Sequence, residues 1–111
     1  MVLMKILTWN IRGVGRQEKR GKIRKIRKIL KERNVNLALL QETKRVAISD
    51  KEVKALWEGK KIKYMAVDSE GLVGGLFCIW DPKVFQIHDC FSNNRFILLL
   101  GTLFNLLNVL Y

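Results

Sequence analysis

Residues 3–10 read LMKILTWN and residues 37–43 read LALLQET, and the fold prediction starts from these two stretches. Both are short, apolar and partly alternating, which is typical of a buried strand. Between them, residues 18–33 place isoleucine or leucine at intervals of three and four, which predicts a helix with one apolar face. A strand, a helix and a strand within about forty residues form a βαβ unit, so we expect two parallel strands joined by a right-handed crossover.

The remaining chain predicts one more helix and several antiparallel strands. Ser49 or Asp50 can cap a helix that carries Val53, Leu56 and Trp57 on one face. Turn-rich connections then separate four further expected strands, at residues 62–67, 75–80, 84–88 and 95–104. Because short connections favour hairpins, we predict an α/β or α+β protein with a mixed sheet.

The composition sets the class of protein and of partner. The 111 residues suffice for one domain or part of one, and the 49% of hydrophobic residues exclude a disordered basic tail. Lys and Arg number 21 against 10 Asp and Glu, a formal net charge of +11. This excess favours an anionic partner, most simply nucleic acid. The alternative is a solvated basic face without a partner.

Cysteine usage and hydropathy bear on the compartment. Cys78 and Cys90 are too few for a disulfide scaffold and lack the spacing of a zinc site, which favours a reducing environment. No stretch resembles a secretory signal, and the longest apolar run, at residues 96–111, is interrupted and shorter than the ~20 residues that span a bilayer. We therefore expect an intracellular protein, with the nucleus among the candidate compartments, and no membrane partner.

Polar residues end both strands of the βαβ unit. Asn10 closes the first strand, and Glu42 closes the second. Ligands of such units bind beyond the carboxyl ends of the strands, so both side chains are expected at one edge of the sheet. A carboxylate supplies a hard oxygen ligand for Mg²⁺, and a neutral amide can donate to a phosphate oxygen. The alternative is that Asn10 only turns the chain and Glu42 is a solvated strand end.

The two strand ends also carry motifs of a known family. TWNIRG at residues 8–13 and LQETK at residues 40–44 resemble the endonuclease/exonuclease/phosphatase family, most closely the N-terminal part of the endonuclease domain of plant LINE-type (non-LTR) retrotransposons. The likeness continues through GGL at residues 74–76 and IWDP at residues 79–82. It implies the N-terminal part of a four-layer α/β sandwich of the DNase-like type, and Mg²⁺-dependent hydrolysis of DNA phosphodiesters.

Carried over by position, the resemblance assigns roles at the two strand ends. Asn10 is similar to the site asparagine that contacts the phosphate and the metal shell, and Glu42 to the metal-binding glutamate. Arg12 and Lys44 adjoin these motifs and are expected to touch the substrate backbone, whereas Trp9 is expected to pack in the core. We expect DNA as the partner and no small-molecule cofactor besides Mg²⁺.

The family completes its site with an Asp-x-Asn and a late Ser-Asp-His segment, and neither occurs in this sequence. We therefore interpret residues 1–111 as a partial domain whose C-terminal part is missing. His88 is followed by Asp89, in reverse order and mid-chain, and is interpreted as an ordinary strand or turn residue. Without a general base or further carboxylates, we expect weak Mg²⁺ binding and no cleavage.

Two other functions are compatible with parts of the sequence. A nucleic-acid-binding module without catalysis would use the eleven Lys and Arg that lie between residues 12 and 33. A dinucleotide-binding domain is suggested by Gly13 and Gly15 between a strand and a helix, but Glu18 stands where the third glycine of that fingerprint belongs.

Overall fold

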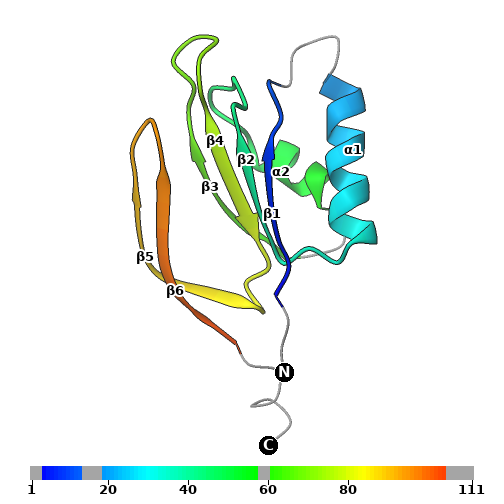
Figure 1. The fold of residues 1–111 in the computed structure, drawn as a ribbon, viewed down its shortest axis with the longest axis vertical. Coiled ribbons are helices and arrows are strands. Elements are labelled where there is room, and N and C mark those ends of the chain that lie inside the picture. Colours follow the sequence, from blue (N-terminus) through cyan, green and yellow to red (C-terminus); the bar gives the residue numbers. More distant parts are fainter. Residues whose placement is uncertain (1–3, 14–18, 58–60, 105–111) are drawn as a thin grey trace, which may run out of the picture.

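The computed structural model describes residues 4–13, 19–57 and 61–104, which form a sheet, two helices and a hairpin (Figure 1). In chain order the elements are β1 (Ile6–Asn10), α1 (Lys19–Glu32), β2 (Leu37–Gln41), α2 (Asp50–Leu56), β3 (Lys63–Val67), β4 (Leu76–Trp80), β5 (Phe85–Ser92) and β6 (Ile97–Leu103). The main sheet has the order β1-β2-β4-β3, and β5 and β6 form a separate two-stranded sheet. The predicted α/β class is confirmed.

The predicted βαβ unit is also confirmed. β1 and β2 pair in parallel, in a register that runs from Ile6 opposite Leu37 to Asn10 opposite Gln41. β4 pairs antiparallel with both β2 and β3, which makes the sheet mixed. Two residues after the end of α1, Asn34 adopts the left-handed conformation with a φ of 52°, which an asparagine tolerates at a helix C-terminus.

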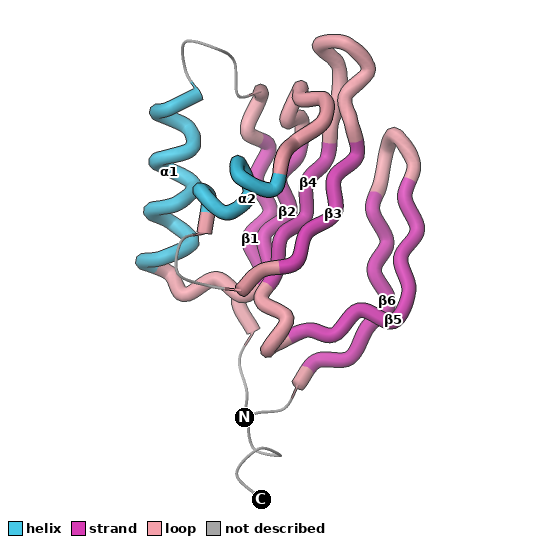
Figure 2. The backbone as a smooth tube through the Cα atoms, turned by 180° about the vertical axis from the view of Figure 1, so that it is seen from behind, coloured by secondary structure: helices cyan, strands magenta, loops and turns pink. Residues whose placement is uncertain are grey.

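Both helices lie on one side of the main sheet, and the hairpin lies on the other (Figures 1 and 2). Ile26 and Leu30 of α1 are almost fully buried against the sheet. α2 begins with a capping box in which the Ser49 side chain accepts from the backbone N–H of Glu52. Arg27 ties the helices together, because its Nε donates to the carbonyl oxygen of Ala55 at 2.8 Å.

The core lies between the sheet and the helices. Phe77 and Ile79 of β4 point into it and are 1% and 0% exposed. Their neighbours Cys78 and Trp80 point to the opposite face, as the alternation of a strand requires, and are also buried. This burial raises the pKa of the Cys78 thiol to about 12, so the thiol is protonated at neutral pH.

The hairpin differs from the sequence prediction in position and length. We expected strands at residues 84–88 and 95–104, whereas β5 extends to Ser92 and pairs with β6 apart from the main sheet. A register shift between Ile87 and Asp89 leaves His88 in a bulge, where its Nε2 lies 2.6 Å from the Thr102 hydroxyl. His88 is thus a strand residue, as predicted. Neither helix of the described residues is long and apolar enough to cross a bilayer.

Candidate functional site

Asn10 and Glu42 lie at the same edge of the main sheet. Asn10, the last residue of β1, stands opposite Gln41, the last residue of β2, and Glu42 follows directly. The pairing continues one step further, because the Ile11 N–H donates to the Gln41 carbonyl at 3.0 Å. In Figure 1 this edge is at the top, where both strands end. Both side chains are exposed, so a ligand can reach them from solvent.

The Asn10 side chain has one half engaged by the protein. Its Oδ1 accepts from the backbone N–H of Arg12 at 3.1 Å, which orients the amide group. In the described part of the chain, its Nδ2 has no hydrogen-bond partner. The free half of Asn10 is therefore a donor, which suits a phosphate oxygen better than a metal ion.

The loop that follows β1 is held by α1. Lys22 donates from Nζ to the carbonyl oxygens of Ile11 and Gly13, at 2.9 and 2.6 Å. Arg12, between them, is exposed and has a φ of 53°. The sequence analysis did not identify Lys22, because a lysine in a basic helix gives no signal that separates a loop-binding role from a solvated one.

The loop that follows β2 is held from two sides. On one side, the carbonyl oxygen of Glu42 accepts from the Gly13 N–H at 2.6 Å. On the other, the N–H groups of Thr43 and Lys44 donate to the carbonyl oxygens of Gly75 and Gly74, at 3.1 and 2.8 Å. Glu42 is therefore fixed between the β1 loop and the start of β4.

Several non-glycine residues at this edge have a strained backbone. Glu42 and Lys44 have φ values of 51° and 53°, close to the 53° of Arg12. The left-handed conformation costs roughly 1–2 kcal/mol for such residues, and strained residues tend to cluster at functional sites. Arg12, Glu42 and Lys44 thus place left-handed backbone in both loops that follow the paired strands β1 and β2.

Gly75 and Thr43 form the buried base of the edge. Gly75 has a φ of 93°, and a Cβ at this position would collide with the Thr43 Oγ1 and lie 3.0 Å from the Lys44 nitrogen. Thr43 is 2% exposed, and its Oγ1 has no hydrogen-bond partner among the described residues. The sequence analysis named Gly75 only as part of a motif and did not identify Thr43.

A mostly apolar cavity of about 200 Å³, with cationic side chains in its walls, lies between the edge and α1. Its walls combine cationic side chains with the candidate amide, and are formed by Trp9, Asn10, Ile11, Arg12, Lys22, Lys25 and Ile26. As predicted, Trp9 packs against the core. The cavity brings Asn10 and Arg12 together with Lys25 of α1, whereas Lys22 in the same wall is engaged by the loop carbonyls.

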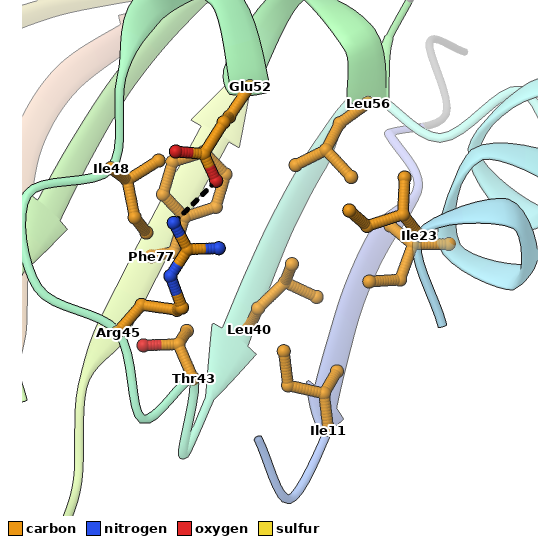
Figure 3. A pocket seen from close by; sticks show the side chains of 10 residues that line it. Ile11, Ile23, Leu40, Thr43, Arg45, Ile48, Glu52, Leu56 and Phe77 are labelled. Atoms are coloured by element: carbon orange, nitrogen blue, oxygen red, sulfur yellow. Dashed lines mark ion pairs between the residues drawn. The ribbon is translucent and has the colours of Figure 1, made fainter. Parts of the chain in front are cut away.

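A second, smaller cavity lies between the β2 loop and α2 (Figure 3). It has a volume of about 40 Å³ and is mostly apolar. At its mouth, Arg45 and Glu52 form an ion pair at 2.6 Å, with side chains 22% and 28% exposed. Such a partly solvated pair contributes about 1 kcal/mol or less, and here it links the loop that carries Glu42 to α2.

The described residues do not by themselves fit a resident Mg²⁺. They contain no group of three or more His, Cys, Asp or Glu side chains that could hold a metal ion. Glu42 is the one carboxylate that the motifs place at this edge, and Mg²⁺ prefers several hard oxygen ligands. Within the described residues, the edge therefore offers one carboxylate, one amide donor and exposed cations.

Comparisons with known proteins add evidence on the fold alone. No protein-family model and no curated protein matches the sequence. Among solved structures, the chain is similar to a functionally unknown conserved protein from Enterococcus faecalis V583, with 19% sequence identity and a TM-score of 0.53. The match covers 79% of this chain and 35% of that protein, so the chain spans about a third of the length of the structure it matches.

Proposed function

We propose that this chain is the N-terminal part of a DNase-like four-layer α/β sandwich of the endonuclease/exonuclease/phosphatase type, and that its β1–β2 edge binds a phosphodiester of DNA. The observation that carries the proposal is the position of Asn10 beside Glu42 at the ends of paired parallel strands, next to a cavity with Arg12 and Lys25 in its walls. The motifs at these strand ends and the net charge of +11 support the same function.

In this proposal each edge residue has a distinct task. Asn10 donates from its free Nδ2 to a non-bridging phosphate oxygen, while its Oδ1 keeps the loop in place. Arg12 and Lys44 contact the neighbouring backbone through their exposed cations. Glu42 is a weak Mg²⁺ ligand when it acts alone. His88 is engaged in the hairpin, so we propose binding without hydrolysis for this chain.

An exchange of amide for carboxylate tests the binding role of Asn10. In Asn10→Asp the acceptor for the Arg12 N–H remains, whereas the donor to phosphate is replaced by a negative charge. We expect the Kd for a fluorescein-labelled DNA duplex to rise about tenfold, the equivalent of losing one hydrogen bond to a charged group. Fluorescence anisotropy measures this change.

Gln86→Glu is the matched control, because it introduces the same charge at an exposed position of the hairpin. The control is expected to raise the Kd less than twofold. An equal loss of affinity in both variants would mean that only net charge matters.

In a parallel plasmid assay we expect no Mg²⁺-dependent nicking above background. Robust nicking that Glu42→Gln abolishes would refute the proposed lack of hydrolysis.

The second candidate function is a nucleic-acid-binding module in which the β1–β2 edge has no part. The observation in its favour is the row of exposed cations on α1. It predicts salt-dependent DNA binding that neither Asn10→Asp nor Glu42→Gln alters beyond the effect of Gln86→Glu.

A further inference from the structure

The outward face of α1 is almost entirely cationic. Its exposed side chains in the described part of the helix are Arg24, Lys25, Lys28, Lys31 and Glu32. Arg24, Lys28 and Lys31 follow one another at intervals of four and three residues, so they form a single row along the helix. We call these three residues the α1 basic row.

The α1 basic row is not explained by the stability of the fold. No salt bridge joins any of its members to an acidic side chain within the described residues. Like charges at intervals of four destabilise a helix by a few tenths of a kcal/mol. Lys22 and Arg27 differ from the row, because both are partly buried and bind backbone carbonyls. The row is therefore available for an external anion.

A membrane surface and a nucleic acid are both large anionic partners, and the burial of α1 favours the nucleic acid. A helix that binds a membrane surface inserts an apolar face between the lipids. Ile26 and Leu30, on the apolar face of α1, are 2% and 1% exposed because they pack against the sheet. The apolar face of α1 is therefore not available for insertion between lipids. Binding to nucleic acid requires only cations within reach of its phosphates.

α1 also reaches the candidate edge, through a residue that does not belong to the α1 basic row. Lys25, next to Arg24 in sequence, lines the same cavity as Asn10 and Arg12. From Arg24 to Lys31 the helix rises about 10 Å, and a duplex carries about six phosphate charges over that length. Figure 1 shows α1 along the outer side of the molecule, opposite the hairpin, so no other described element covers it.

We infer that the α1 basic row is a second, sequence-independent contact surface for the backbone of the nucleic acid that the edge binds. This inference rests on the proposed function in that nucleic acid is the partner. It extends the contact from the strand ends along the length of α1. Because the row offers point charges without bidentate or base-edge contacts, it contributes affinity and orientation and no preference for sequence.

The salt dependence of duplex binding tests the inference. The slope of log K against log[salt] is negative, and replacing Arg24, Lys28 and Lys31 together by glutamine is expected to reduce its magnitude by about two to three, since each phosphate contact contributes about −0.9. The matched control replaces Lys51, Lys61 and Lys83, which are exposed and lie outside α1, and changes the net charge equally. Its slope is expected to change by less than one. A charge-conserving variant, Arg24→Lys with Lys28→Arg and Lys31→Arg, should keep the wild-type slope.

Equal slopes in the two glutamine variants, or no change in either, would overturn the inference. Tighter binding of the wild-type chain to vesicles rich in phosphatidylserine than to the duplex would also overturn it. The test separates this surface from the edge. If Asn10→Asp binds DNA as tightly as Gln86→Glu, while the α1 glutamine variant shows a weaker salt dependence of binding, then the proposed role of the edge is wrong and the role of the α1 basic row is supported. The reverse pattern removes the row alone.

Discussion

Phe77→Ala is expected to lower the free energy of unfolding by about 4 kcal/mol. Phe77 is 1% exposed, belongs to the central strand β4 and packs against Tyr64 with ring centroids 5.7 Å apart. Its removal leaves a cavity between the sheet and both helices, which the surrounding side chains fill only in part. Urea unfolding, followed by tryptophan fluorescence, measures the loss.

Phe91→Ala is the control for this change. Phe91 lies in β5 and is 54% exposed, so the same truncation there removes about half as much buried surface as at Phe77. We expect a loss of about 1–2 kcal/mol. Similar losses in the two variants would contradict the position of the core between the main sheet and the helices.

Gly75→Ala is expected to cost about 3 kcal/mol of stability. Alanine must adopt a φ of 93°, and its methyl group must displace Thr43 and the Lys44 backbone. Because Thr43 follows Glu42 directly, the same displacement moves the candidate edge. The affinity for duplex DNA should therefore fall even at temperatures where the variant is folded.

Gly71→Ala separates strain from collision. Gly71 has a φ of 63°, but no atom lies within 4 Å of the position that a Cβ would take. The expected cost is about 1 kcal/mol, from the left-handed backbone alone, and DNA binding should not change. If Gly71→Ala destabilised the protein as much as Gly75→Ala, the close packing of Thr43 on Gly75 would be wrong.

The parts of the fold that follow from local periodicity could be predicted from the sequence. The row of Ile23, Ile26 and Leu30 predicts α1, and the apolar strands on either side of it predict the parallel pair. Asn10 and Glu42 could be placed at one edge for the same reason, since parallel neighbours end on the same side. Their roles in binding stay a prediction.

The hairpin could not be placed, because alternation along a strand does not say which strand it pairs with. Residues 84–104 satisfy the pattern equally well in one mixed sheet and in the separate pair that the structure shows. The contacts of Lys22 with loop carbonyls and of Thr43 with Gly75 depend on chain segments that meet only after folding. Nothing in the local sequence marks them.

Titration of the isotope-labelled 111-residue chain with a short DNA duplex, observed by two-dimensional ¹⁵N NMR, is the decisive test of binding at the β1–β2 edge. We predict that the side-chain Nδ2 signals of Asn10 shift on binding, together with the backbone amides of Gly13 and Lys44 on the two loops that flank it. Shifts confined to α1 or to the hairpin, with the Asn10 side-chain signals unmoved at saturation, would contradict it.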